Sequence, residues 1–325
     1  MKIRLMIESI FIVVILFVVT FIGIVGFRLA QPIDKKTHSD SPNDEWYYLP
    51  AYQNYSPNGL PDFSQLQQAD WRDWKGRVNL CGAVSLADIF WWFDSKHENQ
   101  NGFPGDDNDT YPLVQDYHAI GTPNPGPNSD DHNFNNVNDN HTPFLRFRRN
   151  GELIERIAWY TNRQKDMIRY EILGRFGGLF NALKLFYGIK KWLFDCHLQN
   201  NFSVKPVLKP SFSTIVTYLH NNSGIILGLS SAGVSPNNTS ASPPWGHFVA
   251  VAGINPLGYI ALSDPLQDIL DPSSDPYDHN NASIVSHDIW HVNFTSPYPK
   301  AASWWIPDYF DGALIIGALI ISEKT

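Results

Sequence analysis

A thiol that could act as a nucleophile stands at position 81 of this 325-residue chain. Cys81 lies where a polar, glycine-containing stretch gives way to an apolar run with helical character. A thiolate at the start of a helix is favoured by the positive end of the helix dipole. Such a nucleophile also needs a base, a group that orients the base, and donors for an oxyanion. Cys81 is therefore a candidate nucleophile whose partners must come from elsewhere in the chain.

His247 and Asp264 are the pair whose settings suit the base and its orienting group. His247 opens the apolar run HFVAVAGI, and Asp264 closes YIALSDP; the intervening NPLG predicts a hairpin turn. Because the mean of 247 and 264 is 255.5, a hairpin centred near Asn255 sets the two residues across from each other. Directly opposite side chains have Cβ atoms about 5 Å apart. This spacing predicts an imidazole–carboxylate hydrogen bond that would fix the His247 tautomer.

Each of these residues also has a structural interpretation. Cys81 could be a small core residue, or it could form a disulfide with Cys196 in an oxidising compartment. His247 alone could be a satisfied core histidine. Asp264 precedes a proline and could simply end a strand and begin a turn. The three residues together favour a catalytic interpretation.

Two further patterns could bind metals. His287 and His291 are four residues apart, but no third ligand has convincing spacing, and HDIWHV alternates like a strand. The polar stretch 99–143 contains GDDNDT and NSDDHN, which lack the spacing of an EF-hand loop. A long solvated loop is preferred there, with calcium left as an alternative. We expect no cofactor.

The rest of the sequence predicts the helices and strands that must position these residues. The segment 81–94 has helical periodicity, with its apolar residues on one stripe along the helix. Helical periodicity also occurs in the segments 150–165, 178–198 and 211–220. Strand-like runs then follow, namely GIILGLSS, HFVAVAGI, YIALSDP and ALIIGALIIS. The last run is too short to cross a bilayer and predicts a closing central strand. Trp71, Trp74, Trp91 and Trp92 are interpreted as core residues rather than a substrate platform. Helices followed by an antiparallel sheet predict an α+β domain over residues 61–325.

The N-terminal segment indicates the compartment. Residues 10–27 are almost continuously apolar and follow Lys2 and Arg4. This run is close to the roughly 20 residues that span a bilayer. Because Arg28 spoils the possible cleavage site, residues 1–30 are interpreted as a signal anchor, with a cleaved signal peptide as the alternative. Residues 31–60, rich in Pro, Asn, Ser, Asp and Tyr, are interpreted as a linker leading off the membrane.

Two properties of the rest of the chain bear on its partners. Asn-x-Ser/Thr triplets, which are acceptors for N-glycans, are spread over the chain and fit an extracytoplasmic domain. They begin at Asn54, Asn108, Asn140, Asn201, Asn221, Asn237, Asn238, Asn281 and Asn293. The net charge is -8, and no cluster of Lys and Arg lies on an aromatic-interleaved surface. These properties argue against a nucleic-acid partner.

Four motifs in order carry a resemblance to a known family. They are PDFSQ (61–65), NLCGAVSLADIFWWFDSK (79–96), WGHFVAVAGIN (245–255) and ALSDP (261–265). The set resembles the papain-like cysteine peptidases related to the bacteriocin-leader-processing enzymes, and within them the exported C-thirty-nine-like branch. Members of that branch show P-D-F-x-Q, C-G-P-x-x-x-A-x-x-x-W-W-F-D, G-H-x-V-x-V-x-G and S-D-P. The segment DDH at 130–132 and the NV at 136–137 also resemble part of that branch.

The resemblance implies a papain-like fold in which N-terminal helices pack on an antiparallel sheet. It implies that Cys81 is the nucleophile, His247 the general base and acid, and Asp264 the orienting residue. Gln65 matches the glutamine that forms the oxyanion hole together with the Cys81 backbone N–H. The chain departs from the pattern at Ala83, where the family has proline, a residue that presets helical φ without doing chemistry.

Gln67 and Gln68 are rivals for the oxyanion role, since a small misalignment would exchange them with Gln65. The resulting expectation is a membrane-anchored or secreted cysteine peptidase that acts outside the cytoplasm on a peptide or protein substrate. Two alternatives stay open. One is a transglutaminase-like acyltransferase with the same triad, and the other is a non-catalytic exported surface glycoprotein used for binding.

Overall fold

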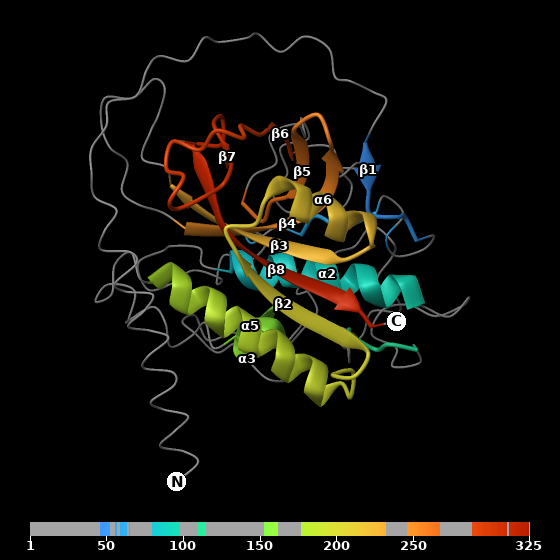
Figure 1. Cartoon of the computed structure of the whole chain (residues 1–325). Coiled ribbons are helices and arrows are strands. Elements are labelled where there is room, and N and C mark those ends of the chain that lie inside the picture. Colours follow the sequence, from blue (N-terminus) through green and yellow to red (C-terminus); the bar gives the residue numbers. More distant parts are fainter. Residues whose placement is uncertain are drawn as a thin grey trace. The chain divides into compact units, whose positions relative to one another are not determined.

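An eight-stranded antiparallel sheet forms the centre of the computed structural model, in the order β2-β8-β3-β4-β5-β6, with β1 paired to β4 and β7 to β8 (Figure 1). The strands are β1 Tyr47–Tyr48, β2 Phe202–Leu208, β3 Gly224–Ser231, β4 Gly246–Asn255, β5 Tyr259–Ser263, β6 Asp288–His291, β7 Trp305–Ile306 and β8 Ala313–Glu323. The last of these lies between β2 and β3, which confirms the predicted central strand. β2 and β7 carry no clear alternation in the sequence and were not predicted.

The structure describes residues 46–52, 56, 59–63, 65, 80–97, 110–114, 153–161, 177–231, 246–266, 288–310 and 312–324. All of them belong to one compact unit, Asp40–Thr325. Several predictions lie outside the described residues: the signal anchor at 1–30, nearly all of the 99–143 loop, Gln67, Gln68, Trp71, Trp74 and His287. Among the described helices, none has the length and apolarity needed to cross a membrane.

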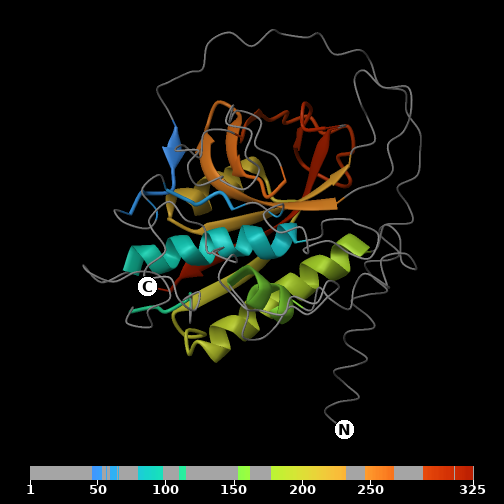
Figure 2. The same cartoon turned by 180° about the vertical axis from the view of Figure 1, so that it is seen from behind.

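Four helices flank the sheet in this part of the chain, and together they confirm an α+β fold. They are α2 Cys81–His97, α3 Leu153–Tyr160, α5 Gly177–Asp195 and α6 Phe212–His220. Figures 1 and 2 show α2 and α6 on opposite faces of the sheet, with α3 and α5 beside α2. The described part of the predicted 150–165 helix ends at Tyr160. Ser211 caps α6 by accepting a hydrogen bond from the Thr214 N–H.

Helix α2 is the buried axis of the domain. The sequence predicts a single apolar stripe, but every residue from Gly82 to Ser95 is buried. A helix enclosed on all sides must be apolar nearly all round, and the run Ile89 to Phe93 meets that requirement. Trp91 and Trp92 are 2% and 0% exposed, so they are core residues as predicted. The one-stripe prediction was wrong because α2 packs against the sheet, α3 and the chain that precedes it.

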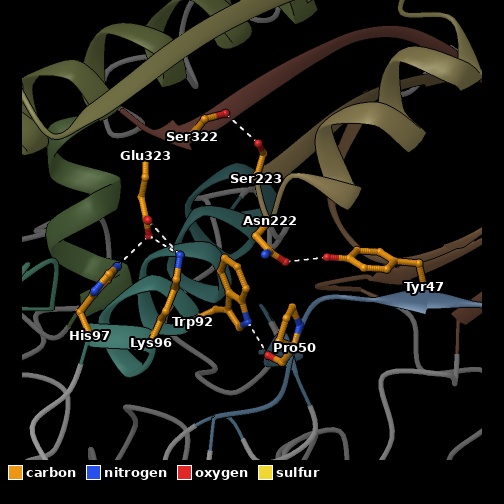
Figure 3. Close-up of polar contacts among 9 residues, drawn as sticks. All are labelled: Tyr47, Pro50, Trp92, Lys96, His97, Asn222, Ser223, Ser322 and Glu323. Atoms are coloured by element: carbon orange, nitrogen blue, oxygen red, sulfur yellow. Dashed lines mark hydrogen bonds and ion pairs between the residues drawn. The ribbon is translucent and has the colours of Figure 1, made fainter. Parts of the chain in front are cut away.

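Part of the predicted linker belongs to the domain. Tyr47 and Tyr48 form β1 opposite Ile254 and Gly253 of β4. The Tyr47 hydroxyl donates to Asn222 Oδ1 at 2.6 Å, and Trp92 Nε1 donates to the Pro50 carbonyl at 2.9 Å (Figure 3). Leu49 and Leu60 are buried as well. The 31–60 boundary was therefore wrong for these residues, because the aromatic WYYLP stretch buries apolar surface within a polar segment.

The C-terminal end of α2 is held to the last strand by charge. Glu323 of β8 accepts hydrogen bonds from Lys96 Nζ at 2.8 and 2.9 Å, and its Oε1 lies 2.7 Å from His97 Nε2 (Figure 3). Beside this cluster, the Ser223 and Ser322 hydroxyls bond at 2.7 Å. These contacts fix the far end of the helix, so that its other end is presented at a defined place on the sheet.

Candidate active site

Cys81 is the first residue of α2 and is partly exposed. The first turn of the helix closes on Leu80, whose carbonyl accepts from the Ala83 and Val84 N–H groups at 2.8 and 2.9 Å. The Cys81 side chain therefore lies at the positive end of a 17-residue helix dipole, as the sequence predicts. Cys81 and Cys196 are not joined by a disulfide, so the disulfide interpretation was wrong. Cys196 is buried just after α5.

His247 lies next to this end of α2. It is the second residue of β4 and pairs with Leu229 of β3. The Ser85 hydroxyl in the first turns of α2 donates to the Phe248 carbonyl at 3.1 Å, in a buried bond between helix and strand. This bond joins residues close in sequence to both Cys81 and His247, and it brings two segments far apart in the chain together.

Asp264 follows β5 and contacts His247 directly. The His247 Nε2 and Asp264 Oδ1 atoms are 2.6 Å apart, and the side chains are 8% and 0% exposed. The predicted imidazole–carboxylate hydrogen bond is therefore confirmed. The bond occupies Nε2, so Nδ1 is the ring nitrogen that remains for Cys81.

The two residues meet through a different register from the one predicted. The pairs nearest the turn are Asn255↔Tyr259 to Gly253↔Ala261, and the pairs beyond it are Val251↔Leu262 and Ala250↔Ser263. Ala252 is thus an extra residue, a β-bulge. Continued by one residue, this register sets Asp264 opposite Val249, two positions from His247. The prediction that 247 and 264 lie directly opposite was wrong, because the turn is centred near 257 and the strand carries a bulge.

The charges around His247 favour its protonated form. Burial by itself would lower the pKa of the imidazole. The negative charges of Asp264 and Cys81, and the hydrogen bonds that both side chains make with the ring, outweigh burial and raise the pKa of His247 to about 10. By reciprocity, the same interaction favours the thiolate form of Cys81. The three side chains therefore form a continuous chain, Cys81–His247–Asp264, centred on the imidazole.

Asp264 has further partners that the sequence did not predict. Its Oδ1 also accepts from the Leu266 N–H at 2.9 Å, and its Oδ2 accepts a short hydrogen bond from the Tyr309 hydroxyl. Tyr309 is 0% exposed. It lies 45 residues after Asp264 in an irregular stretch between β7 and β8, where no periodicity could mark it.

Gln65 lies beside the end of β5. Its backbone N–H donates to the Pro265 carbonyl at 2.8 Å, one residue from Asp264. The side chain is 2% exposed, and its Oε1 accepts no hydrogen bond from the part of the chain that the structure describes. The structure thus brings Gln65 to the same strand end as Asp264.

A buried polar cluster holds the segment that carries Gln65. The Phe63 N–H donates to Asp88 Oδ1 at 3.0 Å. The Ser263 hydroxyl lies 2.8 Å from Asp62 Oδ1, 3.1 Å from Asp88 Oδ2 and 2.9 Å from the Pro61 carbonyl. Helix α2, strand β5 and the residues around Asp62 are therefore joined by polar contacts about two helical turns along α2 from Cys81. Asp88 is 0% exposed and serves as this junction.

No protein-family model, curated protein or solved structure matches the chain.

Among the described residues, no group of three or more His, Cys, Asp and Glu side chains could hold a metal ion. His291 lies on β6, whose strand character was predicted, and His287 is outside the described residues. The groups that do converge are a thiol, an imidazole and a carboxylate, with a glutamine near the carboxylate. Such a set has the nucleophile, base and orienting group that acyl transfer needs.

Proposed function

We propose that the protein is a cysteine peptidase that hydrolyses peptide bonds through Cys81, His247 and Asp264. The observation that carries this proposal is that His247 has two acidic partners. Asp264 contacts its Nε2, and the Cys81 side chain also makes a hydrogen bond with the ring. A core histidine needs one partner for each nitrogen, but it does not need a helix-terminal thiol and a buried carboxylate at once. A structural cysteine gains nothing from a charged imidazole.

The reaction would proceed in two halves. The Cys81 thiolate attacks the peptide carbonyl carbon, and a C–S bond forms as the carbonyl oxygen becomes an oxyanion. The Gln65 amide and the Cys81 backbone N–H donate to that oxyanion. The C–N bond then breaks, and the His247 imidazolium gives its proton to the leaving amine. A thioester between Cys81 and the acyl group remains.

Water completes the cycle. Neutral His247 removes a proton from a water molecule, whose oxygen attacks the thioester carbonyl. The C–S bond breaks, the carboxylic acid product leaves, and the thiolate–imidazolium pair forms again. Asp264 holds the ring in the required tautomer throughout. No metal or cofactor takes part in this scheme.

The proposal extends to the fold and the compartment. A helix that begins at the nucleophile and packs against an antiparallel sheet bearing the base is the arrangement that a papain-like fold implies, and the four sequence motifs support it. We further propose that residues 1–30 anchor or export the protein, so that the domain acts outside the cytoplasm on peptide or protein substrates.

Alkylation of Cys81 tests the proposal without a known substrate. At pH 6 an ordinary thiol is below 1% thiolate, since its pKa is about 8.5. The ion pair predicts fast reaction of Cys81 with iodoacetate or an epoxysuccinyl inhibitor, and a loss of about a hundredfold in the His247→Ala variant. Cys196→Ser removes the second thiol as background, and His220→Ala, on the exposed face of α6, is the matched histidine control.

Equal labelling of the wild type and His247→Ala at pH 6 would overturn the catalytic proposal and favour a binding protein that retains the fold. Selective labelling of Cys81 with no cleavage of casein or peptide libraries, but with incorporation of amines, would favour the acyltransferase instead.

A further inference from the structure

The Asp264 carboxylate is held on both oxygens. Oδ1 receives the His247 ring and the Leu266 N–H, and Oδ2 receives the Tyr309 hydroxyl. The Asp264 side chain is wholly buried, so solvent cannot replace a missing partner. A carboxylate bonded at one oxygen can still turn about its Cβ–Cγ bond, whereas bonds at both oxygens fix its plane. Tyr309 therefore determines how Oδ1 is presented to His247.

Tyr309 is itself rigidly placed. Its ring packs against Trp290 of β6 and Phe310, with centroid separations of 4.9 and 5.1 Å. Its carbonyl accepts from the Gly312 N–H at 2.8 Å, which closes a tight turn into β8. Phe310 within that turn has φ 48°, a left-handed conformation that is costly for a bulky residue. Backbone strain of this kind persists where the surroundings over-determine it, and it is frequent at functional sites.

We propose that Tyr309 is a positioning residue of the active site, which orients His247 through Asp264 and so completes a four-residue chain from Cys81. This inference rests on the proposed peptidase function and adds to it a residue that the four sequence motifs do not contain. The chain draws on four separate parts of the fold: the start of α2, the start of β4, the end of β5 and the turn before β8.

The groups that act electrostatically on His247 among the described residues are Asp264 and Cys81. Tyr309 is joined to the ring through the Asp264 carboxylate. Replacing its hydroxyl by hydrogen leaves Oδ2 buried without that donor, and an orphaned buried acceptor seeks another arrangement. Rotation of the carboxylate would weaken its contact with His247. The imidazolium would then lose its proton at a lower pH.

The test is Tyr309→Phe, followed by the rate of Cys81 alkylation with iodoacetate as a function of pH. Because iodoacetate is an anion, its reaction slows once the His247 imidazolium loses its charge, so the alkaline limb of the profile reports that proton. We expect the limb to move to lower pH by about one pH unit or more, so that the rate falls on the alkaline side while the rate at neutral pH changes little. The matched control is Tyr160→Phe, which removes a tyrosine hydroxyl that donates to Asp195 at 2.6 Å, a pair formed between α3 and α5.

The outcomes separate this inference from the proposed function. If wild-type alkylation does not depend on His247, the peptidase proposal fails and the role of Tyr309 fails with it. If it depends on His247 but the Tyr309→Phe limb stays at the wild-type pH, Tyr309 is merely structural and the peptidase proposal stands. A loss of thermal stability alone, with the limb unmoved, would likewise reduce Tyr309 to a structural residue.

A second measurement covers the case in which Tyr309→Phe does not fold. In the intact wild-type chain carrying ¹³Cζ-tyrosine only at position 309, the Cζ resonance reports the hydrogen bond of the phenol oxygen. We expect it to shift with the same midpoint as the alkaline limb of alkylation. A resonance that stays constant through that limb would show that Tyr309 and His247 are not coupled, and would overturn the inference.

Discussion

His247 contacts Asp264 on one face of the β4–β5 hairpin because Ala252 bulges out of the ladder between them. Side chains alternate between the two faces of a strand, so each extra residue reverses the alternation beyond it. If the pairs nearest the turn continued without the bulge, Asp264 would stand opposite Ala250, and His247 would point to the other face. With the bulge, the two residues are diagonal neighbours on the same face, within reach of long side chains.

Asp264→Asn should weaken the imidazolium while keeping the shape of the side chain. The pKa of His247 is lowered by burial and raised by the charges of Asp264 and Cys81, with a net increase to about 10. Without the negative charge of Asp264, less counteracts the lowering of the His247 pKa by burial, so the pKa of His247 falls. The alkaline limb of iodoacetate alkylation should move to lower pH. Asp195→Asn removes a carboxylate bonded to Lys191 and Tyr160 and should leave the limb in place. An unmoved limb in Asp264→Asn would contradict the assigned contact.

The same pKa makes stability depend on alkaline pH. The folded-state pKa of His247, about 10, lies above the unfolded value of about 6.5. Stabilisation from the protonated ring is therefore fully present below pH 6.5 and is lost as the pH rises through 10. We expect the Tm difference between the wild type and His247→Gln to shrink from pH 6 to pH 10, measured by circular dichroism. A difference that grows or stays constant over that range would be inconsistent with a charged His247.

Gln65→Ala should lower turnover more than substrate binding. Loss of one oxyanion donor typically costs about 10²- to 10³-fold in kcat. The Gln65 backbone bond to Pro265 does not involve the side chain, so the local fold should survive the substitution. Steady-state kinetics on a peptide selected from a library would give kcat and KM separately. Gln67→Ala and Gln68→Ala are the matched controls, and a larger loss in either of them would transfer the oxyanion role to that residue.

Glu323→Gln should reduce stability without affecting the active site. Lys96, His97 and Glu323 have side chains that are 21–26% exposed, so their contacts contribute about 1 kcal/mol or less at neutral pH. Burial raises the pKa of Glu323, but the hydrogen bonds and charges of His97 and Lys96 lower it overall. The stabilisation is thus present above pH 4.5, the usual value, and is lost as the pH falls through the folded pKa.

Thermal unfolding at pH 7 and pH 3 would check this sign, since the deficit of Glu323→Gln should be smaller at pH 3 than at pH 7. Cys81 lies about 22 Å from Lys96 along α2 at 1.5 Å per residue. Its alkylation rate should therefore match the wild type, and a slower rate would mean that the two ends of α2 are coupled.

The local elements around the site could be predicted from the sequence, because each has its own signal. The change from polar to apolar residues at Cys81 marks the start of α2, and Asn255–Gly258 marks the hairpin turn, where Gly258 has φ 104°. Such signals arise from side-chain burial and backbone sterics within a few residues. They were sufficient to bring Cys81, His247 and Asp264 together as candidates.

The exact strand register and the partners Tyr309 and Asp88 could not be predicted in the same way. Ala252 lies in VAVAGI, where any small apolar residue could occupy the bulge. No local pattern therefore shows that His247 and Asp264 point to the same face of the sheet. Tyr309 reaches Asp264 through the tertiary fold, and the burial of Asp88 depends on the segment 61–65 folding back over α2. These contacts depend on how distant segments pack, which residue spacing does not encode.

Cleavage in H₂¹⁸O tests the central claim most directly. A peptide library is incubated with the wild type, with Cys81→Ala and with Cys196→Ala, and the products are analysed by mass spectrometry. If Cys81 forms a thioester that water resolves, the wild type and Cys196→Ala will yield new C-termini carrying one ¹⁸O atom, and Cys81→Ala will yield none. Cleavage that persists in Cys81→Ala, or an absence of ¹⁸O-labelled products from the wild type, would contradict the assignment of the protein as a cysteine peptidase.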